Sequence, residues 1–259
     1  RSDPHISVKQ LTMAYGRFVV MREIDFTIQH GDIFIIMGGS GCGKSTLMKI
    51  LIGLKSPAQG NVYYKDVSFW ESDSATQKRL MRNFGILYQS GALWSSMTLA
   101  ENVALPLQHY TDLSTPEIME LVSLKLSLVG LAGFEDFYPS EISGGMRKRA
   151  GLARAIALDP DVLFFDEPSA GLDPVTSGNL DELIITINCT LGTTVVIVTH
   201  ELASIFAISD RVVMLDPDEH GIIAVGTAAE LRDHSSDERV RLFFGRNLAA
   251  KKRSDRKCR

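Results

Sequence analysis

The 259-residue sequence has few of the features that mark secreted or membrane-spanning proteins. Its three cysteines, Cys42, Cys189 and Cys258, lack the spacing of a disulfide framework or a zinc site, which favours a reducing compartment. No apolar run reaches the roughly 18 residues of a membrane-spanning helix, and the first residues do not resemble a signal peptide. We therefore expect a soluble, cytoplasmic protein, and any membrane part of its function would belong to other subunits.

The chain also lacks the broad basic surface that nucleic-acid binding requires. Its formal net charge is −4, so we expect no nucleic-acid partner. Basic charge gathers only at the end, where a single acid, Asp255, follows Ala249. The basic residues there are Lys251, Lys252, Arg253, Arg256, Lys257 and Arg259. Such a tail is typical of a solvated segment, and contact with anionic lipid or with a partner is the alternative.

Alternating strand and helix patterns predict an α/β fold. Strand patterns occupy residues 6–15, 23–29 and 31–38, and an apolar helix pattern follows a glycine-rich turn at 44–54. Two later runs, 161–166 and 193–200, are continuously apolar and β-rich. That composition is typical of central strands buried on both faces.

The middle of the chain is predicted to be mostly helical from Ser90 to about Pro139. We expect breaks at Pro106, at residues 112–117 and at 130–134, with Ser114 or Thr115 capping a helix that Pro116 begins. After Gly226, two short helices are expected at 227–233 and 237–247.

These patterns divide the chain into three parts. Residues 1–89 and 141–225 form the predicted α/β core, and 90–140 form an inserted helical subdomain, with the motif at 142–149 at its end. Residues 226–259 form C-terminal helices and the basic tail.

Residues 38–46, GGSGCGKST, fit the phosphate-binding pattern G-x-x-x-x-G-K-[ST] between a strand and a helix. Backbone N–H groups of such a loop, with the positive end of the helix, bind phosphate. Lys44 is expected to reach the β- and γ-phosphates of ATP, and the Ser45 hydroxyl to ligate Mg²⁺. The predicted ATP contacts in this loop are Gly38, Gly39, Ser40, Gly41, Cys42, Gly43, Lys44, Ser45 and Thr46.

Cys42 has two readings within this loop. A helix N-terminus favours a reactive thiolate, which bound ATP would protect from alkylation. Alternatively, Cys42 is a small residue that only fits the turn.

The apolar run VLFFDEP ends on two carboxylates, Asp166 and Glu167. The first can hold Mg²⁺ through water, and the second can orient or deprotonate an attacking water. General-base catalysis of this kind contributes about 10²- to 10⁴-fold. Together with the phosphate-binding loop, this pair predicts a nucleotide hydrolase.

A second anion site is predicted where Ser143, Gly144 and Gly145 begin a helix. Residues 142–149, ISGGMRKR, resemble the signature motif of ATP-binding-cassette (ABC) ATPases. The resemblance implies a homodimer in which the signature of one chain closes over ATP held by the other. It also implies a P-loop NTPase core with an antiparallel β subdomain and an inserted helical subdomain.

Four further positions match the ABC pattern in the correct order. Tyr15 matches the aromatic residue that stacks on adenine, and Gln89 matches the Q-loop glutamine that contacts Mg²⁺ or the attacking water. Asp173 matches the D-loop, which crosses the dimer interface. His200 matches the switch histidine that contacts the γ-phosphate.

One position departs from the family pattern, since Met146 replaces the usual signature glutamine. Methionine packs rather than accepting hydrogen bonds as an amide does, but the serine and both glycines that should bind phosphate remain. Residues 88–107 and 143–160 resemble the branch of ABC ATPases that serves phospholipid transport with MCE proteins, including the Mla system and Mkl-type ATPases.

That branch implies a peripheral protein on the cytoplasmic side of an inner membrane. Its expected partners are a second copy of the chain, an integral membrane permease, an MCE-type lipid-binding protein and, in some members, a small cytoplasmic regulatory subunit. The permease would bind beside Gln89, at four residues: Ala92, Leu93, Trp94 and Met97. Alternatively, these four residues are only part of the core of the helical subdomain.

Three alternatives remain for the activity. An ATPase subunit of an ABC transporter for another substrate would use the same motor. A non-transport ABC protein usually carries a second cassette or a long coiled-coil insertion. A P-loop kinase would need an acceptor pocket and no signature motif.

Overall fold

The computed structural model describes residues 4–245, so the basic tail predicted from Ala249 and Cys258 lie outside the described residues. Two sheets form the centre of the molecule. The four-stranded sheet has the order β2–β1–β4–β5. Its strands are β1 (Ile6–Tyr15), β2 (Phe18–Ile28), β4 (Gln59–Tyr64) and β5 (Val67–Ser68).

The six-stranded sheet has the order β10–β9–β3–β8–β7–β6. Its strands are β3 (Ile33–Gly38), β6 (Phe84–Leu87), β7 (Val162–Asp166), β8 (Thr194–Val198), β9 (Arg211–Asp216) and β10 (Gly221–Gly226). All neighbours in it are parallel except β10, which runs antiparallel to β9. This mixed arrangement confirms the predicted α/β fold with an antiparallel β part.

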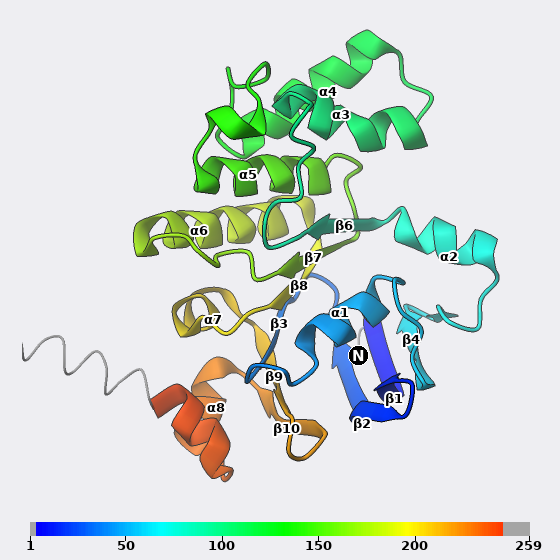
Figure 1. Cartoon of the computed structure of the whole chain (residues 1–259), viewed down its shortest axis with the longest axis vertical. Coiled ribbons are helices and arrows are strands. Elements are labelled where there is room, and N and C mark those ends of the chain that lie inside the picture. Colours follow the sequence, from blue (N-terminus) through cyan, green and yellow to red (C-terminus); the bar gives the residue numbers. More distant parts are fainter. Residues whose placement is uncertain (1–3, 246–259) are drawn as a thin grey trace, which may run out of the picture.

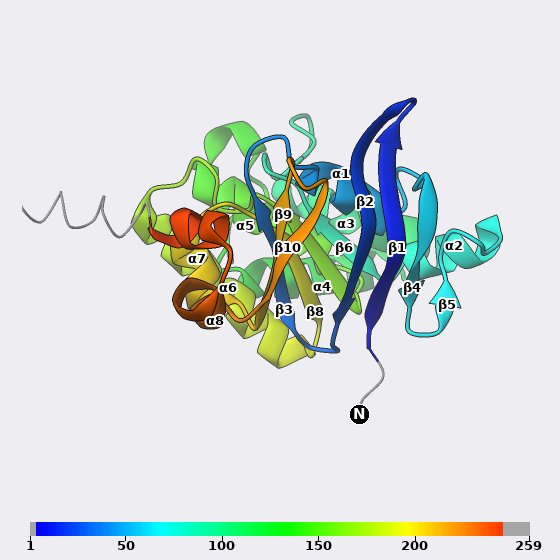
Figure 2. The same cartoon turned by 90° about the horizontal axis from the view of Figure 1, so that it is seen from below.

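Both faces of the six-stranded sheet are buried, as the continuous apolar runs predict. On β3, Ile33 and Ile35 belong to one core cluster, whereas Phe34 and Ile36 belong to another. The first cluster lies under the helices, and the second lies between this sheet, α1 (Lys44–Leu51) and the four-stranded sheet. Figure 2 shows the six-stranded sheet between these two layers.

Seven more helices follow α1 between residues 52 and 234, with a 3₁₀ turn at Pro139–Glu141. They are α2 (Ser74–Met81), α3 (Leu99–Tyr110), α4 (Thr115–Leu128), α5 (Gly144–Ala155), α6 (Pro174–Leu191), α7 (Leu202–Ile208) and α8 (Ala228–His234). Residues 238–245 are also helical, as predicted after Gly226. None of the helices in the described part of the chain combines the length and apolar character needed to cross a bilayer.

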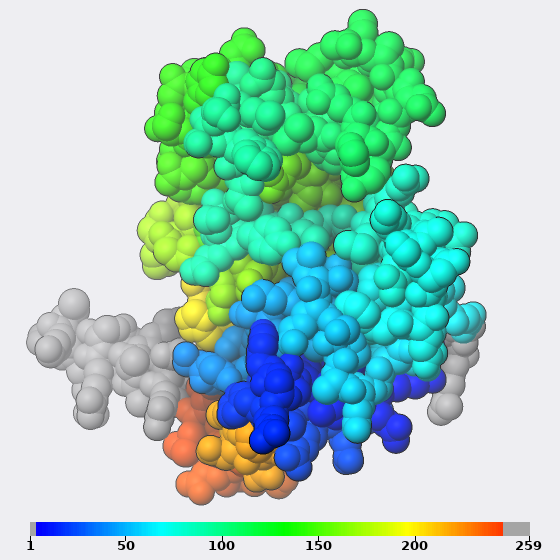
Figure 3. Space-filling model, turned by 45° about the vertical axis from the view of Figure 1, so that its right-hand side comes forward, coloured from blue at the N-terminus to red at the C-terminus, as the bar shows by residue number. Residues whose placement is uncertain are grey.

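Helices α3 and α4 come from the segment predicted as an inserted helical subdomain. They lie at one end of the molecule, drawn in green, and the C-terminal elements in orange lie at the other (Figures 1 and 3). Ser114 caps α4 in a capping box with Glu117, within the predicted break. We propose residues 90–140 as the bounds of this subdomain.

The predicted break at Pro106 is wrong, because α3 continues through it to Tyr110. An interior proline removes one backbone hydrogen bond and costs about 3 kcal/mol. The helix persists because its other face is packed: Val103, Ala104 and Leu107 all lie in the core. Burial of that face outweighs the local cost.

Parallel pairing sets the C-terminal parts of three strands side by side. Val198 of β8 pairs with Ile36 of β3 on one side and with Asp166 of β7 on the other. The three residues therefore form one row across the sheet, and the segments after them leave the sheet at the same edge. This row positions the site described below.

The buried Asn102 side chain fixes the segment that leads into α3. Asn102 is fully buried, and its amide donates to the carbonyls of Trp94 (3.1 Å), Met97 (3.2 Å) and Thr98 (2.8 Å). Its Oδ1 accepts the N–H of Trp94 at 2.7 Å. One amide thereby holds both ends of residues 94–98.

We expect Asn102→Ala to lower the free energy of unfolding by about 2 to 4 kcal/mol, because buried backbone groups lose their partners. Urea unfolding followed by circular dichroism measures this change. Gln108→Ala, an amide truncation at an exposed position of the same helix, is the matched control and should change the stability by less than about 0.5 kcal/mol. Equal unfolding midpoints for both variants and the natural chain would contradict the assignment.

Candidate functional site

A cavity of about 950 Å³ opens at the edge where β3, β7 and β8 end. Ten of the residues predicted from sequence line it: Gly38, Gly39, Ser40, Gly41, Lys44, Ser45, Gln89, Asp166, Glu167 and His200. They come from four separate segments, and the parallel register brings them together.

The loop between β3 and α1 begins at a position that only glycine fits. A Cβ on Gly38 would lie 2.5 Å from the carbonyl oxygen of Leu215 and 2.6 Å from the Sγ of Cys42. At the other end, Gly43 has a φ of 89° and is the N-cap residue of α1. The loop therefore turns its backbone towards the cavity without side chains in the way.

Lys44 holds its ammonium group over this loop. Its Nζ donates to the carbonyls of Gly38 and Gly39, each at 2.9 Å. An ammonium group has three donors, and the third contact, to the Sγ of Cys42 at 3.7 Å, is weak. That donor is available to a phosphate oxygen.

The surroundings of Cys42 do not favour a reactive thiolate. Cys42 is 1% exposed, and burial raises the pKa of its thiol despite the neighbouring Lys44. The raised pKa disfavours the thiolate. Of the two readings of Cys42, the structure favours the small residue that fits the turn.

The two carboxylates after β7 have different surroundings. Burial, and then the charge of Glu167, raise the pKa of Asp166, while Lys49 and Lys44 lower it. The backbone turns sharply at Glu167, whose φ is 49°. A left-handed conformation is uncommon for a residue other than glycine, and such strain gathers at functional sites.

His200 orients the Glu167 carboxylate. The Nδ1 of His200 lies 2.8 Å from the Oε1 of Glu167. The second oxygen, Oε2, is buried and has no hydrogen-bond partner among residues 4–245. A buried carboxylate oxygen normally has a partner, so Oε2 is an exception. The Glu167 side chain is 15% exposed and lines the cavity.

The oxygen donors beside this pair fit a magnesium ion. The Ser45 hydroxyl, the Asp166 carboxylate and the Gln89 side-chain amide all line the cavity. Mg²⁺ binds hard oxygen ligands, and it usually takes one or two protein groups together with phosphate and water. The residues present therefore fit such an ion bound together with a nucleotide.

Tyr15 and Thr46 lie beside the cavity rather than in its lining. The Tyr15 hydroxyl is 3.3 Å from the Thr46 Oγ1, which connects the ring to the first turn of α1. The ring is 50% exposed, and the Nζ of Lys55 lies 4.1 Å from its centroid. An exposed ring at this place can stack on a planar base.

The signature residues have local roles and do not line the cavity. Ser143 caps α5 by accepting the N–H of Met146 at 3.2 Å. A Cβ on Gly145 would lie 2.6 Å from the Cγ2 of Thr176, so this glycine also permits α5 to pack against α6. Gly144 follows the cap as the first residue of the helix.

Asp173 likewise has a local role. Its carboxylate accepts the N–H groups of Val175 and Thr176, each at 3.0 Å, and so caps α6. Hydrogen bonds from Thr176 lower the pKa of Asp173, which keeps the capping carboxylate ionised. The structure of one chain does not bring Asp173 or the signature to the loop at Gly38.

The residues proposed as a permease seat are not all alike. Trp94 is 62% exposed, whereas Leu93 packs against the core cluster. The preceding backbone is tied to α5, because Arg154 donates to the carbonyls of Ala92 (2.8 Å) and Gly91 (3.2 Å). Trp94 therefore remains a candidate for contact with a partner, and Leu93 is part of the fold.

The sequence did not predict one wall of the cavity. Arg239, Leu242 and Phe243 line it from the C-terminal helix at residues 238–245. Their spacing in DERVRLFF predicts a helix, but nothing local indicates its position. Only tertiary contacts place this helix beside the phosphate-binding loop.

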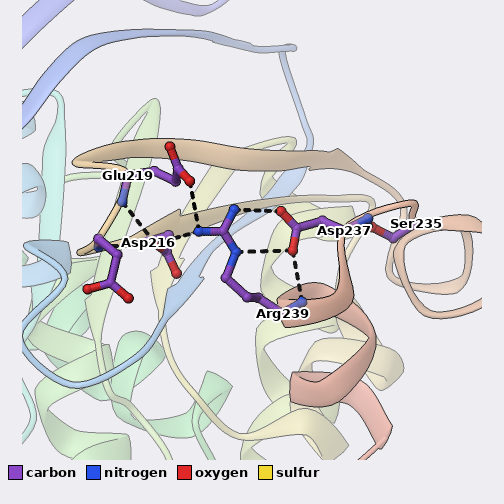
Figure 4. Close-up of polar contacts among 6 residues, drawn as sticks. Asp216, Glu219, Ser235, Asp237 and Arg239 are labelled. Atoms are coloured by element: carbon purple, nitrogen blue, oxygen red, sulfur yellow. Dashed lines mark hydrogen bonds and ion pairs between the residues drawn. The ribbon is translucent and has the colours of Figure 1, made fainter.

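Arg239 anchors that wall to the end of β9. Its guanidinium contacts Asp237 at 2.7 Å and both Asp216 and Glu219 at 3.1 Å, as Figure 4 shows. The hydrogen bond from Arg239 lowers the pKa of Asp237 to about 2. Asp216 follows Leu215, whose carbonyl faces Gly38. The contacts of Arg239 therefore reach the end of β9 that lies next to the phosphate-binding loop.

Comparison with protein families and known proteins agrees with this arrangement. Residues 21–170 match the family described as ABC transporter. The probable ribonucleotide transport ATP-binding protein mkl of Mycobacterium tuberculosis is 42% identical over 210 residues. That match covers 81% of this chain and 58% of the mycobacterial protein, so the chain spans less than two thirds of the length of that relative.

The intermembrane phospholipid transport system ATP-binding protein MlaF of Escherichia coli K12 is 37% identical over 239 residues, which cover 92% of this chain and 88% of that protein. Among solved structures, the dimeric ATP-binding cassette MJ0796 in a post-hydrolysis state with ADP and Pi is similar with a TM-score of 0.77. It is 28% identical, and the match covers 86% of this chain and 98% of that one. The chain therefore belongs to the ABC transporter family and has the fold of its ATP-binding cassettes.

Proposed function

We propose that this chain is the ATP-hydrolysing subunit of an ABC transporter that moves phospholipid between membranes of a cell envelope. The observation that carries the ATPase part is the Glu167 carboxylate, which His200 orients at 2.8 Å and which lines the same cavity as the phosphate-binding loop. The phospholipid part is supported by the likeness to MlaF over 92% of this chain and 88% of that protein.

An ATPase subunit for another substrate is the second candidate. The 42% identity to the mycobacterial protein, whose name gives ribonucleotide transport, favours it. That likeness covers only 58% of the mycobacterial protein. Both candidates use the same site, so they differ in the partners and the cargo.

ATP binding follows from the loop and its helix. The backbone N–H groups of residues 39–46 and the N-terminus of α1 receive the phosphates, and Lys44 contacts the β- and γ-phosphates. Tyr15 stacks on the adenine ring. Ser45, Asp166 and Gln89 would hold Mg²⁺, and the bound ion would neutralise charge on the phosphates.

Hydrolysis uses the carboxylate after β7. Glu167 accepts a proton from the attacking water, while the Nδ1 of His200 orients its carboxylate. His200 holds Glu167 in place and contacts the γ-phosphate with the rest of its ring. The positions of these groups favour in-line attack by the water, because orientation and general-base catalysis both lower the barrier.

We place the signature of a second copy of the chain over the γ-phosphate. The N-terminus of α5, with Ser143, Gly144 and Gly145, is an anion site that the cavity of its own chain does not use. A homodimer puts each α5 against the loop of the partner and creates two equivalent sites. Closure around two ATP molecules drives the transporter, and hydrolysis lets the dimer reopen.

The remaining partners follow from the proposed branch of the family. An integral membrane permease would contact the helical subdomain near Trp94, which is exposed beside the Gln89 segment. An MCE-type lipid-binding protein would receive or supply the phospholipid, and a small regulatory subunit would bind the ATPase. The chain itself would lie on the cytoplasmic side of the inner membrane.

We expect Glu167→Gln to keep ATP binding within about 3-fold and to lower hydrolysis at least about 100-fold, since the base is removed and the shape is kept. Phosphate release and titration with a fluorescent ATP analogue measure the two effects. Glu182→Gln, the same change at an exposed position of α6, is the control and should retain the full rate. A Glu167→Gln chain with more than a tenth of the natural rate would rule out this role.

Ser143→Arg should block ATP-dependent dimerisation and hydrolysis while each monomer still binds ATP, because the guanidinium fills the place of the partner's phosphate. Light scattering of the chain with ATP and phosphate release test this. Mixing Ser143→Arg with Lys44→Ala chains should restore hydrolysis that neither has alone, since one complete site then forms. A Ser143→Arg chain with the natural rate would indicate a site completed by one chain, as in a kinase.

Purification of tagged Glu167→Gln protein from its native membrane with ATP and Mg²⁺ tests the cargo. We expect a permease, an MCE protein and phospholipid to co-purify, because the variant holds the ATP-bound complex. A permease with a soluble solute-binding protein and no enriched lipid would overturn the phospholipid assignment and leave the ATPase assignment intact.

A further inference from the structure

Lys148 is a buried lysine in the second turn of α5. It is only 6% exposed, although lysine is rarely buried to this extent without partners. Its Nζ donates to the carbonyl oxygens of Pro168 (2.5 Å), Ala170 (2.8 Å) and Glu167 (3.4 Å). All three acceptors belong to the turn after β7, so one side chain joins the signature helix to the catalytic turn.

The turn that Lys148 contacts has a strained backbone at Glu167, where φ is 49°. Such a conformation persists only where the surroundings enforce it. The Glu167 N–H donates to the Val198 carbonyl at 2.8 Å, which fixes one side of the residue. Lys148 fixes the other side through the carbonyls of Glu167 and Pro168.

Carbonyl dipoles, rather than a direct ion pair, surround the ammonium group of Lys148. Burial lowers the pKa of Lys148, whereas the nearby carboxylates of Glu201 and Glu167 raise it. A buried charge is tolerated only where hydrogen bonds replace its hydration. The lysine and the turn therefore depend on each other, and loss of the ammonium group would leave the buried Pro168 carbonyl without this donor.

We propose that Lys148 is a positioning residue that couples the two ATP sites of the dimer. This inference rests on the proposed function. Under it, α5 contacts the ATP of the partner chain through Ser143, and Glu167 acts on the ATP of its own chain. Lys148 lies between them, so movement of α5 onto the partner's γ-phosphate changes the position of the Glu167 turn.

This coupling between α5 and the Glu167 turn would make ATP hydrolysis depend on dimer closure. Until α5 meets the partner's ATP, the turn at Glu167 keeps the arrangement set by the separate chain. Closure shifts α5, and Lys148 carries the shift to the carbonyls of Glu167 and Pro168. A displacement of the base by about 1 Å changes a rate by about 100-fold, so a small shift is sufficient.

Lys148→Met tests the proposal, because methionine keeps the length and apolar contacts of the lysine stem and removes its three donors. We expect kcat for ATP hydrolysis to fall about 10- to 100-fold with KM changed by less than about 3-fold. Phosphate release is measured at a protein concentration where the rate per chain no longer rises. If Lys148→Met does not fold, Lys148→Gln, whose amide retains donors, should show the same split with a smaller fall.

Lys125→Met is the matched control for the loss of a buried lysine. Lys125 is 3% exposed and pairs with Asp159, away from the cavity lining. Its substitution should leave kcat within about 2-fold, whatever it does to stability. An equal fall of kcat in both variants would show that Lys148 acts only through general stability, and would overturn the proposal.

A second measurement separates positioning from damage to α5 itself. The double variant Lys148→Met, Glu167→Gln should still dimerise with ATP as Glu167→Gln does, because the N-terminus of α5 is unchanged. Failure of the double variant to dimerise would assign Lys148 to the binding surface and overturn the proposal. A Lys148→Met kcat equal to that of the natural chain would also overturn the proposal.

The failure of this inference and the failure of the proposed function give different results. If the natural chain hydrolyses no ATP at any concentration, the proposed function fails. If the natural chain hydrolyses ATP and Glu167→Gln abolishes the activity, but Lys148→Met retains its kcat, only the coupling by Lys148 is wrong.

Discussion

The site depends on the register of three parallel strands. Because Val198 pairs with both Ile36 and Asp166, the segments that leave β7 and β8 begin at one level of the sheet, and β3 continues beyond it only to Gly38. A one-residue slip of any strand would reverse its inward and outward faces and would displace a whole segment of the site. The two core clusters therefore set the chemistry as well as the stability, since such a slip would exchange the side chains packed in each of them.

The local patterns in the sequence predicted this edge well. The phosphate-binding loop, the two carboxylates and His200 each lie directly after a continuous apolar run, so their places follow from the strands before them. Pro106 was predicted wrongly, because a rule about local backbone cost cannot include the burial of Val103, Ala104 and Leu107. Packing outweighed propensity there.

Other contributions arise only from the folded chain. Arg239 lines the cavity because its guanidinium contacts Asp216 and Glu219, at and just after the end of β9. No local sequence pattern indicates these contacts. The sequence alone does not distinguish Lys148 from the other basic residues of its helix, yet its ammonium group donates to the carbonyls of Pro168 and Ala170. The same is true of Cys42, where the expected effect of the helix end was outweighed by burial.

Hydrogen bonds from Asn102 and Arg154 attach the segment after Gln89 to two different helices, α3 and α5. Residues 94–98 are held to α3 by the four bonds of one buried amide, so exposed Trp94 is linked directly to that helix. Gly91 and Ala92, which precede this segment, have φ of 76° and 49°. Because Arg154 of α5 holds the carbonyls of both, this segment is tied to the helix that would contact the partner's ATP under the proposed function.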